Sequence, residues 1–117
     1  MGDQNRDIHV RTAFTRKDCV RITPYRHLGP NGLSFAHWIR DRLLDLLKQE
    51  EPLFPPTQMD DGPLTVRVVF RLSAEEVRAL DLARGSSPVS RGFSRSRWIR
   101  VAVLRSLQPL AVEQRVA

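Results

Sequence analysis

Two stretches of the chain alternate between hydrophobic and polar side chains, which is the pattern of a half-buried β-strand. The clearer stretch is LTVRVVFRL, residues 64–72, and the fainter one is DIHVRTAFT, residues 7–15. The predicted inner faces carry Leu64, Val66, Val68, Phe70 and Leu72 in the later stretch and Ile8, Val10, Thr12 and Phe14 in the earlier one. The predicted outer faces carry Thr65, Arg67, Val69 and Arg71, and His9, Arg11 and Ala13. We therefore expect two strands, each buried on one side only.

A helix is predicted directly after each strand. Ser73 followed by Glu76 has the spacing of a capping box, in which each side chain bonds the other residue's backbone N–H. Thr15 followed by Asp18 repeats this spacing after the first strand. Pro24 comes early in the first of these helices, so we expect that helix to be short or kinked.

A second helix is predicted after each of these, in LSFAHWIRDRLLDLL, residues 33–47, and FSRSRWIRVAVLRSL, residues 93–107. Both stretches begin with an apolar residue and Ser, continue to Trp-Ile-Arg, and end in a Leu-rich tail. Ser34 and Ser94 are the expected N-caps, and Trp38 and Trp98 are expected in the core.

The order strand, helix, helix therefore occurs twice, in residues 7–47 and 64–107, which we interpret as an internal duplication. Between them lies KQEEPLFPPTQMDDGP, residues 48–63, which holds four of the eight prolines. It has no helical or alternating pattern and predicts an extended, partly flexible linker.

The net charge of the chain indicates a class of binding partner. The 19 Lys and Arg exceed the 13 Asp and Glu, for a net charge of +6. All the basic residues except Lys17 and Lys48 are Arg, and all lie in residues 1–48 and 64–117, whereas the charged residues of 49–63 are all acids. Two basic blocks around an acidic spacer are typical of a protein that binds a polyanion, and Arg suits phosphate and guanine. The alternative is an ordinary soluble protein encoded by an Arg-rich, GC-rich genome.

Several classes of function lack support in the sequence. No P-loop, nucleophile elbow or metal-ligand spacing of His and Cys is found, so we expect no enzyme, no metal and no cofactor. There is no apolar run long enough for a membrane span, and the polar start is unlike a secretory signal. The single Cys19 fits a cytoplasmic protein.

One strand with two short helices cannot close a core or pair its strand. Two copies can, by pairing their strands antiparallel and interlocking four helices. The expected fold is mainly α with a two-stranded antiparallel ribbon, in which both repeats form one domain. The chain would be a monomer that imitates a dimer, with a pseudo-twofold axis.

Residues 64–107, with the alternating strand, the SAEEV helix start and SRSRWIR, resemble the ribbon-helix-helix DNA-binding family that includes Arc and MetJ. Residues 7–47 resemble it less well, because of Pro24 and Ala13. The resemblance implies two such units in tandem, with the ribbon in the major groove of double-stranded DNA. It also implies roles in transcription regulation as a repressor, or in plasmid maintenance or conjugation, where tandem copies in one chain are known.

The resemblance assigns two sets of contact residues. The base-reading residues would be Arg67, Val69 and Arg71 from one strand and His9, Arg11 and Ala13 from the other. The phosphate-binding residues would be Ser94, Arg95, Ser96 and Arg97 at one helix start, and Ser34, Phe35 and Ala36 at the other. His37 and Arg100 are near these starts and are candidates for further phosphate contacts.

Physical chemistry supports this independently of the family. A major groove admits a two-stranded ribbon, Arg is the best donor to guanine, and a helix N-terminus attracts an anion. Because the two outer faces differ, we expect an asymmetric DNA site. Three alternatives stay open: an antitoxin-type autorepressor, an accessory protein that works with other DNA-transfer proteins, and a protein-interaction module that no longer binds DNA. Assembly of several molecules on DNA is also left open.

Overall fold

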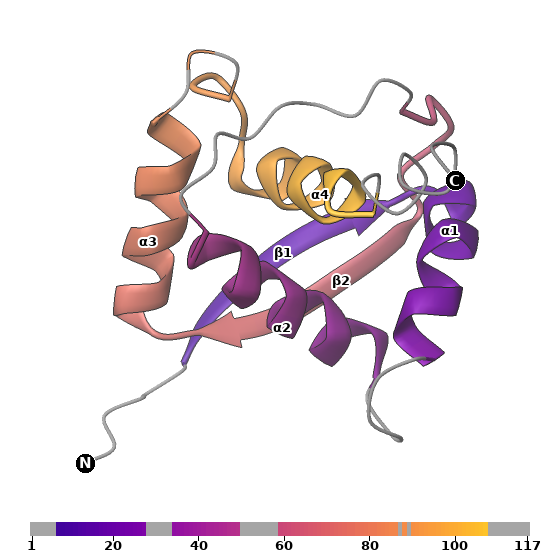
Figure 1. Cartoon of the computed structure of the whole chain (residues 1–117), viewed down its shortest axis with the longest axis horizontal. Coiled ribbons are helices and arrows are strands. Elements are labelled where there is room, and N and C mark those ends of the chain that lie inside the picture. Colours follow the sequence, from indigo (N-terminus) through magenta and orange to yellow (C-terminus); the bar gives the residue numbers. More distant parts are fainter. Residues whose placement is uncertain (1–6, 28–33, 50–58, 87, 89, 108–117) are drawn as a thin grey trace, which may run out of the picture.

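A computed structural model of the chain describes residues 7–27, 34–49, 59–86, 88 and 90–107. Its elements follow one another as strand, helix, helix, twice over. They are β1 (Ile8–Phe14), α1 (Arg16–His27), α2 (Phe35–Leu47), β2 (Val66–Leu72), α3 (Ala74–Gly85) and α4 (Arg95–Arg105). The fold is a mixed arrangement of four helices and one two-stranded antiparallel sheet within the described residues (Figure 1).

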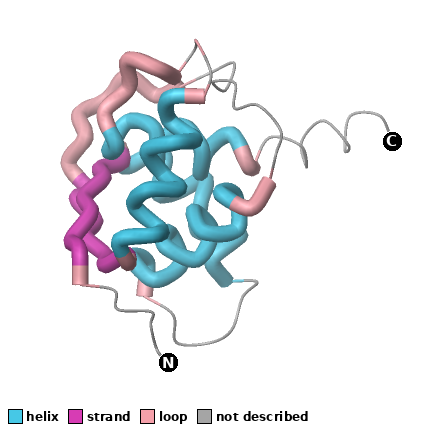
Figure 2. The backbone as a smooth tube through the Cα atoms, turned by 90° about the vertical axis from the view of Figure 1, so that its left-hand side faces the viewer, coloured by secondary structure: helices cyan, strands magenta, loops and turns pink. Residues whose placement is uncertain are grey.

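The two strands pair with each other along their whole length and form what we call the ribbon. The register runs from Ile8 opposite Leu72 to Phe14 opposite Val66, with Arg11 opposite Val69 at the centre. Inner-facing residues of both strands are buried, as the alternating pattern predicts, except that Ile8 and Val66 at the strand starts are only partly buried. The helices lie on the inner side of the ribbon and leave its other face uncovered (Figure 2).

Side-chain caps set the starts of the helices. Thr15 accepts from the Asp18 N–H at 3.1 Å, and the Asp18 carboxylate accepts from the Thr15 N–H at 2.9 Å. Ser73 and Glu76 form the same reciprocal pair at the start of α3. The predicted capping boxes are therefore present in both halves, at equivalent places.

The core is assembled from both halves. Helix α4 packs across β1, and α2 packs across β2, so the second helix of each half contacts the strand of the other half. In Figure 1, α2 and α4 cross the ribbon, whereas α3 and α1 lie at its two ends. The buried cluster includes Phe14, Ile39, Leu72, Leu80 and Ile99, each of which has no exposed surface. Neither half closes a core by itself in this arrangement.

Two details differ from the sequence expectations. Helix α1 continues past Pro24 to His27 and is as long as α3, so of the two predicted alternatives, a short or a kinked helix, the short one is wrong. Pro24 removes the N–H that would bond the Val20 carbonyl, and α1 nevertheless continues for three more residues. Leu64 precedes β2 and is 49% exposed instead of buried.

Helix α4 is more deeply buried than its pattern indicates. The predicted apolar positions Ile99, Ala102 and Val103 are buried, and so are Val101 and Leu104. A helix that is buried on several sides lies in the centre of the packing. Within the described residues, no helix has the length and apolar character needed to cross a bilayer.

Candidate nucleic-acid interface

The outer face of the ribbon carries the residues that the sequence assigned to base reading. His9, Arg11, Arg67 and Arg71 are exposed, and Val69 is 49% exposed. Ala13 also lies on this face but is half-buried. All six therefore share one surface, because successive side chains of a strand point to opposite sides and the two strands are in register.

Cross-strand pairing arranges this face in three rows. His9 lies opposite Arg71, Arg11 opposite Val69, and Ala13 opposite Arg67. Strand β2 supplies an arginine in both outer rows, and β1 supplies one in the central row. The face therefore carries three guanidinium groups and no acid among its six outward residues.

One contact orders the row at the His9 end. The Arg71 Nε donates to the His9 Nε2 at 3.2 Å, which requires the His9 tautomer with a free lone pair at Nε2. Arg has five N–H donors, and this bond uses one of them. The contact restrains the Arg71 side chain while its terminal Nη groups keep donors for a ligand.

The start of α4 is fixed beside the ribbon. Ser94 is an N-cap in extended conformation, and its hydroxyl oxygen accepts from the Arg97 N–H at 3.1 Å. The Thr12 hydroxyl donates to the Ser96 carbonyl at 2.8 Å, which joins β1 of the first half to the first turn of α4. The predicted phosphate anchor Ser94–Arg97 therefore lies next to the strand of the other half.

Arg95 is engaged by a carboxylate in this structure. Its Nε and Nη2 donate to the two Asp81 oxygens at 2.9 and 2.8 Å, and Arg84 also contacts Asp81 at 3.1 Å. These bonds, with Arg95 first, lower the pKa of Asp81 to about 2, and the pKa of Arg95 is raised by the same pairing. Asp81 and a phosphate would compete for the Arg95 guanidinium.

Arg97 and the loop before α4 are ordered by an aromatic ring and a carbonyl. The Arg97 guanidinium lies 4.4 Å from the centre of the Phe93 ring, within cation–π range. Arg84 Nη1 donates to the Phe93 carbonyl at 2.7 Å. Arg97 is exposed, so its charge stays accessible at the helix start.

The start of α2 is the equivalent anchor in the first half. Ser34 accepts from the His37 N–H at 3.1 Å, and the Phe35 ring packs edge-on against Phe14 at 5.8 Å between centroids. Arg26 lies 5.6 Å from the same Phe35 ring. Ser34 is exposed, and Phe35 and Ala36 are half-buried, so Ser34 is the most accessible residue of this predicted anchor.

The two further candidates for phosphate contacts, Arg100 and His37, bind other side chains of the protein. Arg100 is largely buried: its Nε donates to the Asp18 carboxylate at 2.7 Å, and its Nη2 donates to the Asp60 carbonyl at 2.8 Å. The expectation that Arg100 contacts phosphate is therefore wrong, because the guanidinium is used inside the fold. His37 Nε2 lies 2.8 Å from Arg40 Nη2 and 3.5 Å from Asp41.

The partners of Arg95 and Arg100 were not found from the sequence. Asp81 lies on α3, across a loop from Arg95, and Asp18 is far from Arg100 in the chain. The only local signal was the capping box, which predicted the backbone partner of Asp18 but not its ion pair.

No group of three or more His, Cys, Asp or Glu side chains suited to a metal is present in the described part of the chain.

In the comparisons with known proteins, no family model, no curated protein and no solved structure matches this chain.

Proposed function

We propose that the protein binds double-stranded DNA by placing its ribbon in the major groove, and that it serves as a transcriptional regulator or as an accessory protein of plasmid maintenance or DNA transfer. In this proposal the chain is a tandem ribbon-helix-helix protein, a monomer with the layout of a dimer. The outer ribbon residues read base edges, and the starts of α2 and α4 hold backbone phosphates.

The observation that carries the proposal is the pairing of β1 with β2, which gathers all six predicted reading residues on one uncovered face. A two-stranded ribbon fits the width of the major groove, and Arg donates bidentately to guanine O6 and N7. Three arginines on a face without acids favour a polyanion over a neutral partner.

The helix starts support the same geometry. The α4 start is bonded to β1, and α2, whose N-terminus is also capped by a Ser, packs across β2. Each offers backbone N–H groups and the positive end of a helix dipole to a phosphate. Such contacts would fix the register of the ribbon in the groove.

The tandem assignment rests on matched positions. The element order is the same in both halves, both first helices begin with a capping box, and both second helices begin with a Ser N-cap. With the boxes aligned, Arg11 corresponds to Val69, and these two residues pair with each other. That is the relation expected at a pseudo-twofold axis.

The test is selection of binding sites from random duplex DNA, followed by affinity measurements as a function of salt. Arg67→Ala and Arg71→Ala should each lose about 1–3 kcal/mol of discrimination at one base pair. The matched control is Arg78→Ala, because Arg78 is an exposed arginine on α3, outside the ribbon. It should preserve the selected sequence.

The outcomes separate the candidate functions. An unchanged motif in both ribbon variants would remove the reading role of β2. If no salt-sensitive DNA affinity is found at all, the DNA proposal fails, and a protein-interaction module becomes the better interpretation.

A further inference from the structure

Val69 is an exposed aliphatic residue at the centre of the ribbon's outer face, which no helix covers (Figure 2). Its side chain is 49% exposed and lies between Arg67 and Arg71 on the same face of β2. Arg11 lies opposite it on β1. Among the large hydrophobic side chains that are exposed in the described part of the chain, Val69 is the only one that belongs to the ribbon. An apolar group is therefore placed among three cations.

Strand formation does not require Val at this position. Val is favoured in strands, but Arg11 fills the equivalent position of the first half in the same sheet. Single exposed aliphatic residues are common on protein surfaces, and the exposed part of this one gains no hydrophobic stabilisation until a partner covers it. A surface complementary to this arrangement presents an apolar group with hydrogen-bond acceptors on either side.

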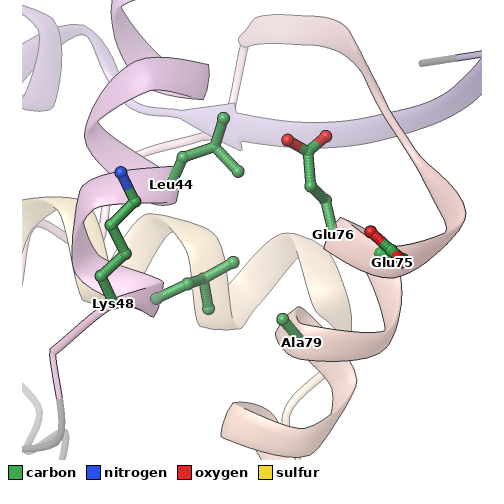
Figure 3. A pocket seen from close by; sticks show the side chains of 6 residues that line it. Leu44, Lys48, Glu75, Glu76 and Ala79 are labelled. Carbon is green, nitrogen blue, oxygen red and sulfur yellow. The ribbon is translucent and has the colours of Figure 1, made fainter. Parts of the chain in front are cut away.

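A second accessible apolar surface of the described chain lies in the groove between α2 and α3. Figure 3 shows Leu44 and Lys48 on α2 across from Glu75 and Ala79 on α3. This groove combines a cation with carboxylates, whereas the outer face of the ribbon has no acid among its six outward residues. A polyanion that carries apolar groups is therefore complementary to the ribbon and not to the groove.

The floor of the DNA major groove presents the required combination of groups. Guanine offers its O6 and N7 atoms as acceptors, which suit Arg, and thymine offers its C5-methyl group as an apolar contact. Unmodified cytosine lacks this methyl group, whereas 5-methylcytosine carries it at the same atom. An aliphatic side chain gains free energy by covering such a methyl group, because both groups then leave water.

We propose that Val69 reads the C5-methyl group of a pyrimidine, thymine or 5-methylcytosine, at a position between the base pairs that Arg67 and Arg71 contact. This inference rests on the proposed binding of DNA by the ribbon and names the chemical group that the ribbon's centre recognises. Alternate residues of a strand are about 7 Å apart and base pairs about 3.4 Å apart, so the methyl group should lie about two base pairs from each arginine contact. The β-branched side chain of Val has a stiff χ1 torsion, which fixes where its methyl groups point.

The experiment uses the full chain and a duplex that carries the site selected from random DNA. Each thymine of the site is replaced in turn by deoxyuridine, which pairs with adenine in the same way and lacks only the C5-methyl group. Fluorescence anisotropy at one salt concentration gives the dissociation constants. We expect one replacement, between the positions that respond to Arg67→Ala and Arg71→Ala, to weaken binding about fourfold, which is the effect of one buried methyl group.

The same position then distinguishes the two sources of the methyl group. Duplexes with cytosine and with 5-methylcytosine opposite guanine are compared there, and the methyl group should strengthen binding by a similar factor. Tighter binding of the thymine duplex than of the 5-methylcytosine duplex identifies thymine as the natural base, and the reverse order identifies a methylated cytosine. Either order supports recognition of the methyl group.

Val69→Ala tests whether this residue makes the contact. The change removes the methyl groups that would cover the base, so the variant should bind the thymine and deoxyuridine duplexes with dissociation constants within about 1.5-fold of each other. Val20→Ala is the matched control, since Val20 is 72% exposed on α1 and the chemical change is the same. This control should keep the preference of the unaltered chain for thymine.

Two results would overturn the inference while DNA binding remains. One is the lack of any methyl effect at the pyrimidines between the two arginine contacts, and the other is an equal methyl preference in Val69→Ala and in the unaltered chain. The deoxyuridine series needs no altered protein, so it is decisive even if Val69→Ala folds poorly. A complete lack of salt-sensitive DNA affinity is a different outcome, which removes the proposed function together with this inference.

Discussion

Arg11 and Val69 lie directly opposite each other at the middle of the β1–β2 ladder, and both side chains are exposed on the outer face of the ribbon. They are equivalent positions of the two halves when the capping boxes are aligned. A homodimer would place two identical residues at this point. In this chain a cation faces an aliphatic side chain, so the centre of the ribbon is intrinsically unsymmetrical.

The first prediction concerns the symmetry of the bound sequence. Arg67 and Arg71 both belong to β2, whereas their equivalents in β1 are His9 and Ala13. The selected DNA site should therefore be non-palindromic, with guanines concentrated at the base pairs that β2 contacts. Selection and sequencing measure this directly. Binding that is unaffected by inverting the site about its centre would contradict it.

The second prediction tests the ion pair between the halves. Arg100→Met should lower the free energy of unfolding by about 3 kcal/mol, because it leaves the buried Asp18 carboxylate without its cation. Chemical denaturation measures the loss. Arg78→Met, at an exposed position on α3, should change stability by less than about 0.5 kcal/mol. Equal effects of the two variants would show that the Asp18–Arg100 contact is not formed in solution.

The third prediction concerns Asp81, whose pKa is lowered to about 2 chiefly by the hydrogen bonds from Arg95. A lowered pKa in the folded state stabilises the protein above the ordinary value of 3.8, and this contribution is lost as the pH falls toward about 2. Asp81→Asn should cost about 1 kcal/mol at neutral pH, since water screens a side chain that is about one-third exposed. The difference from wild type should shrink between pH 4 and pH 2. A difference that is independent of pH in that interval would argue against the pairing.

The fourth prediction follows from the crossed packing. A fragment of residues 59–107 lacks the strand and the helix that cover its core, so it should be unfolded at low concentration. At high concentration it can pair β2 with a second copy, because the inner face of the strand is apolar throughout. Circular dichroism over a range of concentrations measures this. A folded monomeric fragment would show that the second half has a core of its own.

Much of the fold was predictable because it depends on local patterns. The alternation of hydrophobic and polar residues predicted both strands and the faces that they bury. The Ser and Thr caps predicted the helix starts within one residue. The outer face of the ribbon followed from the same alternation. Pro24 was misleading because it predicted an early end of the helix, whereas α1 continues to His27.

Contacts between distant segments were not predictable from such patterns. Arg100 appeared to be an exposed cation near a helix start, but Asp18 and the Asp60 carbonyl hold it in the fold. Arg95 likewise has Asp81 as a partner from a different helix. In a chain with 19 basic residues, local sequence does not distinguish the cations that stay available for a ligand from those that hold the fold together.

The exchange of helices across the ribbon also bears on how this protein can change over evolutionary time. Since α4 lies on β1 and α2 lies on β2, a substitution in the interior of one half must suit a side chain of the other. The outward positions of the two strands carry no such packing requirement, apart from the hydrogen bond between Arg71 and His9. Mutation can therefore specialise each strand for a different ligand surface while the shared interior keeps both halves inseparable.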